Sequence, residues 1–303
     1  MPESFPSKPS QIGEAYKGSL STPHPFKVFD MDLSIIIVNW NSTEYLRACL
    51  QSLYKETKDV VFEVIVVDNA SYDGCAEMLK CAFPEVKFIQ NTENQGFSAA
   101  NNVGFPQALG QFVLFLNPDT VILEDAINTM LGHMRHLKDA GAIGCRLLNT
   151  DGSLQTSSVM PFPTILNQAL NFEALRLLFP RIAFWGIRPL FEDAGSEFVV
   201  QAVSGACILV RRDVFEKIGM FSTDYFMYSE DIDLCHRISL AGYKVYYVRT
   251  AAIIHHGGGS SRQRGANLFS EVKMKDSTMI YLRKYKGGSY AVSYNIVIGL
   301  TAL

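Results

Sequence analysis

Acidic residues that follow apolar runs are the first candidates for chemistry in this sequence of 303 residues. Asp119 stands in Asn117-Pro118-Asp119, directly after the apolar run 112–116, and the proline restricts the turn. A carboxylate placed there can offer an oxygen to Mg²⁺ or Mn²⁺, which proteins bind through one or two carboxylates together with substrate phosphates. Asp68 closes an earlier apolar run in the same way. Each of these aspartates, taken alone, also fits a turn or a helix N-cap.

A second candidate is the acidic segment 228–234, which contains Glu230, Asp231 and Asp233. Three acids at a predicted helix start interact favourably with the helix dipole, and this alone could explain the segment without a role in chemistry. The three positions cannot share one helical face, because only residues three or four apart are neighbours on it. We therefore expect at least one carboxylate to point away from the others, with a cleft as one destination.

His255 and His256 end an apolar run and precede three glycines, Gly257 to Gly259. A histidine in this position fits either a metal ligand or a turn residue. The glycines allow close approach of a ligand, but they lack P-loop spacing. No G-x-G-x-x-G follows the first apolar run, which argues against an NAD enzyme.

The elements that must position these residues alternate between strand and helix. Short β-branched runs predict buried strands of a parallel sheet, and amphipathic segments between them predict helices. In such doubly wound α/β sheets, ligands bind beyond the carboxyl ends of the strands, the edge that Asp68 and Asp119 occupy. The predicted strands are 33–38, 62–67, 86–89 and 112–116, and the predicted helices start at 42 or 43 and cover 77–83 and 97–109.

The second half of the chain is expected to add a strand or strand pair within 199–210, helices at 213–218 and 230–241, and strands at 243–248 and 251–254. The apolar stretch 162–191 predicts a buried helical hairpin packed on the sheet. The alternative is a surface that meets a membrane, with Arg176, Arg181 and Arg188 at the level of the headgroups.

Composition excludes some classes of protein. A formal net charge of -3 gives no support for a nucleic-acid binder, and 48% hydrophobic residues suit a globular protein. The six cysteines show no C-x-x-C spacing, so we expect buried free thiols in a reducing compartment. Residues 1–30 lack the apolar core of a signal peptide and are expected to be a flexible lead-in, whereas 291–303 is apolar but shorter than the roughly 20 residues of a membrane span.

The ordered set of motifs resembles the inverting family 2 glycosyltransferases, in particular the rhamnosyltransferase-like branch that builds bacterial surface polysaccharides. The resemblance covers about residues 33–261. It rests on Val38-Asn39-Trp40-Asn41, Val66-Val67-Asp68-Asn69-Ala70-Ser71-x-Asp73-Gly74, Asn94-x-Gly96-Phe97, Asn101-Asn102-x-Gly104, Leu116-Asn117-Pro118-Asp119, Ser204-Gly205-Ala206, Phe221-x-x-x-Tyr225-Phe226, Glu230-Asp231-x-Asp233-Leu234-Cys235, Arg237, Gly242-Tyr243 and His255-His256-x-Gly258.

The resemblance implies a GT-A type fold and a role for each matching residue. Asp231 is implied as the catalytic base, with Glu230 and Asp233 as neighbours that orient it or the acceptor. Asp119 is similar to the last acid of the family's D-x-D motif, whose first acid is replaced by Asn117, and His255 is a further candidate ligand for Mg²⁺ or Mn²⁺. The implied nucleotide- and substrate-binding residues are Asn39, Asn41, Asp68 (at the nucleobase), Asn69, Asn94, Gly96, Phe97, Asn102, Asn117, Ser204, Gly205 and Asp233.

Through the resemblance we expect a sugar to pass from a nucleotide-diphosphate donor to a hydroxyl of a glycan or lipid-linked glycan. dTDP-rhamnose is the first choice of donor and a UDP-hexose the second. A sugar nucleotidyltransferase would need a glycine-rich basic loop after the first strand, and a non-catalytic sugar-nucleotide-binding protein would not need the acids. We expect a cytoplasmic protein, with a peripheral position at the inner face of the cell membrane as a further expectation.

The expected organisation is a flexible segment 1–30, a glycosyltransferase domain 31–265 and a C-terminal helical segment 266–303 on the acceptor side, with membrane contact as an option. Within the domain, 31–120 is the expected nucleotide-binding half and 121–265 the acceptor and catalytic half.

Overall fold

The centre of the molecule is a mixed, twisted β-sheet, seen in a computed structural model that describes residues 31–170, 176, 178–192, 194–257 and 266–301. The lead-in expected for residues 1–30, and Gly258 and Gly259, lie outside the described residues. The sheet strands are β1 (Leu33–Asn39), β2 (Phe62–Asp68), β3 (Lys87–Gln90), β4 (Phe112–Leu116), β5 (Thr120–Ile122), β6 (Ala140–Leu148), β8 (Glu197–Val200), β10 (Cys207–Arg211) and β11 (Lys244–His255).

The strand order is β3-β2-β1-β4-β10-β6-β11-β5, and β8 also pairs with β11. The first four strands in this order are parallel, β10 runs antiparallel to both of its neighbours, and β11 runs parallel to β6. This arrangement confirms the predicted α/β fold with a mixed sheet. A small antiparallel pair, β7 (Val159–Met160) with β9 (Ala202–Val203), lies beside it.

Helices cover both faces of the sheet. One apolar cluster joins the sheet to α1 (Thr43–Glu56), α2 (Cys75–Ala82) and α4 (Ala126–His136), and the second joins it to α3 (Gly96–Gly104), α7 (Arg212–Lys217) and α8 (Glu230–Leu240). In α1 the buried residues are Leu46, Cys49, Leu50 and Leu53, the spacing of one helical face, which confirms the predicted inward face.

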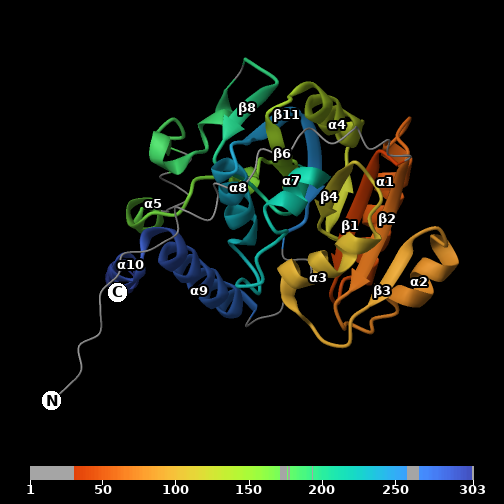
Figure 1. Cartoon of the computed structure of the whole chain (residues 1–303), viewed down its shortest axis with the longest axis horizontal. Helices are drawn as coiled ribbons and strands as arrows, with labels where there is room; N and C mark the ends of the chain where they lie inside the picture. Colours follow the sequence, from red (N-terminus) through yellow and green to blue (C-terminus); the bar gives the residue numbers. More distant parts are fainter. Residues whose placement is uncertain (1–30, 171–175, 177, 193, 258–265, 302–303) are drawn as a thin grey trace.

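Two C-terminal helices form a separate layer against α8. These are α9 (Ala266–Lys286) and α10 (Gly288–Thr301), and Figure 1 shows them beside α8 and away from β2 and β3. Their contact with the rest of the chain has its own apolar core, which includes Tyr225, Tyr281 and Tyr294. Among the described helices, none combines the length and the apolar character that crossing a bilayer requires.

The stretch 162–191 differs from the predicted buried hairpin. Its described parts include the short helix α5 (Ile165–Ala169) and the 3₁₀ helices η3 (Ala183–Trp185) and η4 (Arg188–Phe191), whereas 171–175 and 177 lie outside the described residues. Trp185 and Leu190 are buried on the sheet, but Leu178 and Phe179 are 68% and 50% exposed. The expectation of full burial is therefore wrong, because only part of the stretch reaches the sheet.

Other differences from the predicted elements are small. β5, α4 and β6 were not predicted, and the strands predicted at 243–248 and 251–254 are one strand, β11, with an irregularity between Val248 and Ala252. The remaining 3₁₀ helices are η1 (Phe105–Gln107) and η2 (Thr156–Ser158). All six cysteines are free and five are buried, as expected, whereas Cys81 is exposed.

Candidate active site

A cavity of about 410 Å³ opens at the carboxyl ends of β1, β2 and β4, where the sequence predicts a ligand site. Its walls come from strand ends, from the loop before α3 and from the segment that leads into α8. The predicted site residues that line it are Asn69, Asn94, Gly96, Phe97, Asn117, Asp119, Ser204, Gly205, Glu230, Asp231 and His255. The structure therefore brings together residues that are up to 186 positions apart in the chain.

Asn39, Asn41, Asp68, Asn102 and Asp233 are predicted site residues that do not line this cavity. Asn41 is exposed, and its φ of 51° places it in a left-handed turn after β1. The Asn102 side chain makes two hydrogen bonds to the backbone of Phe221. Its Nδ2 donates to the carbonyl oxygen at 2.9 Å, and its Oδ1 accepts from the amide at 3.1 Å. These bonds give Asn102 a structural role in holding α3 against the turn before α8.

Asp68 and Asn39 face each other because parallel pairing puts them opposite one another at the ends of β2 and β1. Asn39 Nδ2 donates to Asp68 Oδ1 at 2.7 Å, Gln90 Nε2 donates to Asp68 Oδ2 at 2.7 Å, and the Ser71 amide also bonds this carboxylate. Both side chains are almost fully buried. Their bonds hold the strand ends that form the floor of the site, and the contact of Asp68 with a nucleobase stays a prediction.

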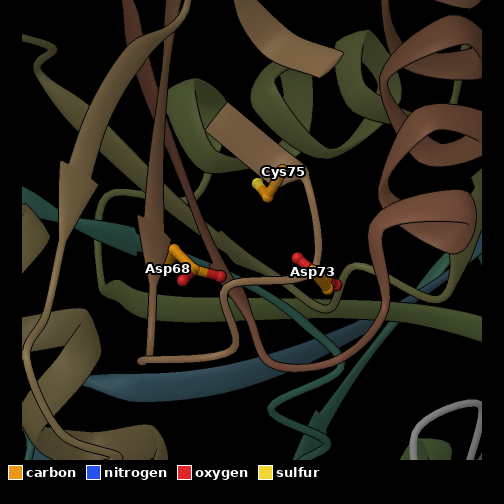
Figure 2. A group of neighbouring side chains, drawn as sticks. All are labelled: Asp68, Asp73 and Cys75. Carbon is orange, nitrogen blue, oxygen red and sulfur yellow. The ribbon is translucent and has the colours of Figure 1, made fainter. Parts of the chain in front are cut away.

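Figure 2 shows Asp68, Asp73 and Cys75, whose potential ligand atoms lie within 4.8 Å of one another. The side-chain amide of Asn39 donates to both carboxylates, and its distance to Asp73 Oδ1 is 3.2 Å. The backbone amide of Thr43 donates to Asp73 Oδ2 at 3.0 Å. Burial raises the pKa of the Cys75 thiol to about 12. The amide donors already bonded to both carboxylates suit a hydrogen-bonded turn.

Asn69 organises the loop that forms one wall of the cavity. Its Nδ2 donates to Asn94 Oδ1 at 2.7 Å, and its Oδ1 accepts from the amide of Gln95 and from Asn91 Nδ2, each at 3.1 Å. The loop then enters α3 at Gly96, whose φ of +79° favours glycine. One buried side chain thus sets the position of the predicted nucleotide loop.

Asp119 and His255 meet because the three-residue strand β5 pairs antiparallel with β11 and puts Thr120 opposite His255. The His255 Nε2 atom lies 3.4 Å from Asp119 Oδ1 and 3.3 Å from Asn117 Nδ2. Gln155 donates from Nε2 to the His255 carbonyl at 2.6 Å and places its Oε1 at 3.0 Å from Nδ1. The Gln155 oxygen at Nδ1 favours the tautomer with its proton on Nδ1, which leaves Nε2, beside Asp119 Oδ1 and Asn117 Nδ2, as a potential metal ligand.

The donor set at this position fits a divalent cation. A carboxylate and an imidazole lone pair at 3.4 Å leave the remaining coordination positions to phosphate oxygens and water, as in other Mg²⁺ and Mn²⁺ sites. Asp119 is only 7% exposed, and it faces the cavity from the end of β4. Asp119 and His255 are therefore the residues that could hold the metal.

Glu230 and Asp231 begin α8 on another wall of the cavity. Asp231 Oδ2 accepts from the Gly205 amide at 2.9 Å and Oδ1 from the Ile232 amide at 2.8 Å, so its carboxylate has a fixed orientation. Burial raises the pKa of Asp231, and these amide donors oppose the rise. A raised pKa makes the carboxylate a stronger base, which is the property that proton abstraction requires.

Glu230 is buried, and its Oε2 atom has no hydrogen-bond partner in the described structure. Burial raises the pKa of Glu230 well above its ordinary value, and the neighbouring charge of Asp231 adds to this effect. A buried polar atom without a partner is costly unless a ligand or water satisfies it. Its position in the cavity wall places this atom where a ligand or water can satisfy it.

Asp233 points the other way, as the spacing of the three acids requires. Its carboxylate accepts from Arg237 Nε at 2.7 Å and lies at 3.0 Å from Lys284 Nζ. It does not line the cavity. The expectation that Asp233 binds substrate is therefore not supported by its position, because its oxygens are already used within the protein.

Several residues in or beside the cavity were not predicted. Gln155 orients His255 but lies in a loop without a motif, and Phe226, Tyr228 and Met274 reach the cavity from the turn before α8 and from α9. Only Phe226 and Tyr228 carried a signal, since both stand in or beside the motifs that bear the resemblance. The left-handed φ values of Tyr228 (69°) and Ser229 (63°) show a strained turn directly before Glu230.

A second cavity, of about 310 Å³, shares Ser157, Met160, Tyr228, Glu230, Asp231 and Met274 with the first. Its other walls include Pro161, Asn167, Gln168, Trp185 and Thr278. Asp119 and His255 do not line this second cavity. The two carboxylates of α8 thus stand between two spaces, and only one of these contains the candidate metal ligands.

Comparison with known proteins identifies relatives over most of the chain. Residues 34–219 match the model of the family described as Glycosyl transferase family 2. The N-acetylglucosaminyl-diphospho-decaprenol L-rhamnosyltransferase of Mycobacterium tuberculosis is 29% identical over 269 residues, 84% of this chain and 85% of that protein. Rhamnosyltransferase WbbL of Escherichia coli K12 is 29% identical over 236 residues, 75% of this chain and 84% of that protein.

Among solved structures, the mannosyltransferase PcManGT of Pyrobaculum calidifontis, in complex with GDP-Man and Mn²⁺, superposes with a TM-score of 0.57. The match covers 85% of this chain and 67% of that chain at 17% identity. At this identity the likeness concerns the fold alone, and it agrees with the GT-A type fold implied by the sequence motifs.

Proposed function

The chain belongs to glycosyl transferase family 2, and we propose that it moves rhamnose from dTDP-rhamnose to a hydroxyl of a glycan or lipid-linked glycan, with inversion at the sugar carbon. The choice of rhamnose is supported by the two relatives named rhamnosyltransferases. A UDP-hexose is the second choice of donor. The observation that carries the proposal is one cavity with Asp119 and His255 at one wall and Asp231 at another.

Asp231 is proposed as the base. An acceptor hydroxyl is a weak nucleophile, so a carboxylate must take its proton as it attacks the sugar carbon. The amides of Gly205 and Ile232 fix the orientation of the Asp231 carboxylate, and burial raises its pKa. Both effects favour proton transfer, and Glu230 Oε2 is placed to orient the same substrate.

Asp119 and His255 are proposed to hold Mg²⁺ or Mn²⁺ at the diphosphate. When bound, such an ion supplies Lewis-acid stabilisation of the negative charge that develops on the leaving diphosphate. Gln155 keeps the His255 lone pair directed toward Asp119. Asn117, which replaces an acid of the family motif, lies 3.3 Å from His255 and contributes no charge to the site.

The donor and the acceptor are proposed to occupy different cavities. In-line displacement with inversion needs the nucleophile and the leaving group on opposite sides of the sugar carbon. The larger cavity contains Asp119 and the nucleotide loop, and the smaller one lies on the far side of Asp231, bounded by Trp185 and by Thr278 of α9. The smaller cavity is lined by residues of 121–265, the expected acceptor half, and by α9, whereas the larger cavity takes residues from both halves.

A peripheral membrane contact through the C-terminal helices is proposed for a lipid-linked acceptor. Helix α10 has no charged residue, and its Val292 and Ile296 are 55% and 59% exposed. Helix α9 carries five basic and two acidic side chains, although acidic residues outnumber basic ones in the whole chain. Exposed apolar side chains beside basic ones suit an anionic lipid surface.

Release of the nucleoside diphosphate from a panel of nucleotide sugars, measured with and without glycan acceptor and divalent metal, tests the proposal. We expect release that needs both additions and is fastest with dTDP-rhamnose. Asp231→Asn should lose at least about 100-fold in kcat, the usual contribution of a general base, while donor binding by calorimetry is retained. Asp213→Asn, at an exposed position of α7 outside the cavity, is the matched control. Full activity of Asp231→Asn would rule out the base assignment.

A further inference from the structure

We propose that helix α9 is a positioning element for the catalytic pair Glu230 and Asp231, and that it acts through the buried carboxylate of Asp233. This inference rests on the proposed function, because it takes Asp231 as the base. Both the catalytic pair and the helix lie beyond the residues that match the family model, 34–219. Three separate contacts join it to the turn and to the helix that carry the base.

The first contact is a buried cluster around Asp233. Its side chain is fully buried and receives four donors. Arg237 Nε bonds Oδ2 at 2.7 Å, and three groups approach Oδ1: Tyr285 hydroxyl at 2.8 Å, Lys284 Nζ at 3.0 Å and Tyr225 hydroxyl at 3.2 Å. Tyr285 and Lys284 belong to α9, so this helix supplies half of the donors that the carboxylate needs.

The charge balance of the cluster depends on α9. Burial alone would raise the pKa of Asp233, but Arg237, Lys284 and Tyr285 outweigh that effect and lower it. The carboxylate is therefore ionised and paired, and Asp233 stands two residues after Asp231 in the first turns of α8. Because a buried charge without its partners is strongly unfavourable, loss of the α9 donors must shift this turn or admit water.

The second contact holds the strained turn before the base. Ser277 of α9 donates from Oγ to the carbonyl of Met227 at 2.7 Å. The next two residues, Tyr228 and Ser229, have φ values of 69° and 63°, and the second is the N-cap of α8. Such conformations are costly for residues other than glycine and persist only where surrounding contacts hold them. Ser277 is one of these contacts, and Glu230 follows directly.

The third contact aligns α9 along α8. The Tyr281 hydroxyl lies 2.7 Å from His236 Nδ1, and the His236 ring packs against Tyr285 and Phe162 with centroids 4.2 Å and 4.4 Å apart. Burial lowers the pKa of His236, which favours the neutral ring, and Nδ1 of the neutral ring can accept a hydrogen bond from the Tyr281 hydroxyl. The helix is thus fixed to α8 one turn beyond Asp233.

A cluster that only stabilised the fold would not affect catalysis selectively. Asp233, Lys284 and Tyr285 do not line the cavity, so they act through Asp231 and not on substrate. A displacement of a catalytic group by about 1 Å costs on the order of 100-fold in rate. The proposed donor contacts, Asp119 and the nucleotide loop, lie on other elements, and α9 adds Met274 to that cavity. Loosening of α9 should therefore lower kcat far more than donor affinity.

The experiment uses the full chain with Lys284→Met and Tyr285→Phe, and with Arg283→Met as control. Arg283 is the exposed neighbour of Lys284 on the same helix, so this control removes the same charge without touching the cluster. We expect kcat to fall about tenfold to 100-fold in both test variants, with a change in donor KM of less than about twofold. Lys284→Arg should recover most of the rate, since it restores the cation.

Hydrogen exchange adds a readout of position. In Lys284→Met the amides of residues 227–233 should exchange faster than in the Arg283→Met control, while those of α1 should not change. Wild-type kcat in both test variants would overturn the inference, as would an equal loss in the control. Should Lys284→Met not fold, Ser277→Ala removes a single bond of the second contact and serves the same measurement.

Failure of this inference is distinguishable from failure of the proposed function. If Asp231→Asn is inactive while Lys284→Met and Tyr285→Phe are fully active, the base assignment stands and the role of α9 is refuted. If Asp231→Asn is fully active, the base assignment itself is wrong, whatever the other variants show.

Discussion

Replacing Gly96 by alanine adds one atom, the Cβ, and this atom alone should displace part of the site. Gly96 begins α3 with a φ of +79°, and a Cβ built on it would lie 2.2 Å from the carbonyl oxygen of Phe226 and 2.9 Å from its carbonyl carbon. Both neighbours are backbone atoms, so no side-chain rotation can relieve the contact. Gly74, the N-cap of α2, has a similar φ of +86° with no atom within 4 Å of such a Cβ. It is a matched control.

The expected cost follows from comparing the two sites. Alanine in the left-handed region costs about 1–2 kcal/mol at both glycines, reduced by about 0.4–1 kcal/mol through the lower entropy of the unfolded chain. At Gly96 the segment at Phe226 must also move away, which breaks the 2.9 Å bond from the Phe97 amide to the Phe226 carbonyl. Losing this hydrogen bond adds about 0.5–1.5 kcal/mol. Gly96→Ala should therefore be less stable than Gly74→Ala by about 0.5–1.5 kcal/mol.

Urea unfolding of both variants measures this difference, and kinetics measure its consequence for the site. Phe226 and Tyr228 line the cavity just before the base, so a shift of this segment should lower kcat at least tenfold in Gly96→Ala. Gly74→Ala should retain most of its activity. Equal free energies of unfolding for the two variants, or full activity of Gly96→Ala, would refute the steric argument.

Three further predictions concern the metal, the base and the C-terminal helices. His255→Ala should raise the Mn²⁺ concentration for half-maximal activity about 10- to 100-fold, the scale seen when a metal site loses a supporting group, as measured by metal titration of diphosphate release. Because burial raises the pKa of Asp231 above 3.8 and the base works deprotonated, kcat/KM should fall as pH drops through that raised value; a profile flat down to pH near 4 would contradict this. Replacing Val292 and Ile296 by serine should weaken sedimentation with anionic liposomes while diphosphate release with a water-soluble acceptor is unchanged; binding equal to that of the unmodified chain would exclude this surface.

Local patterns in the sequence predict the donor side of the site well. The buried strands β1, β2 and β4 are short β-branched or apolar runs, and each ends in polar residues that mark the same edge of the sheet. Asn69, Asn94 and Asp119 follow such runs within a few positions, so their placement depends on short-range information. The structure puts all three at one cavity.

Other parts of the site depend on contacts that no local pattern encodes. Asp119 meets His255 through β5, a strand of three residues too short to give a periodic signal, and through its antiparallel pairing with β11. The direction of Asp233 likewise depends on Lys284, 51 positions later, which draws its carboxylate away from the cavity. The spacing of the three acids predicts that they cannot all point in one direction, but only the packing of α9 shows that Asp233 is the one that points away from the cavity.

The two sides of the cavity therefore differ in how they are held, and this difference has a functional consequence. The nucleotide loop is fixed by Asn69 through bonds within residues 69–96, all inside the matched family region. The base, its left-handed turn and Asp233 all follow residue 219, outside that region, and the buried carboxylate of Asp233 takes part of its donors from α9. Perturbations of the C-terminal layer should then separate donor binding from sugar transfer, because the first uses a preformed loop and the second needs long-range packing. A chain in which both properties decline together would place the C-terminal layer in support of the whole fold instead of the base.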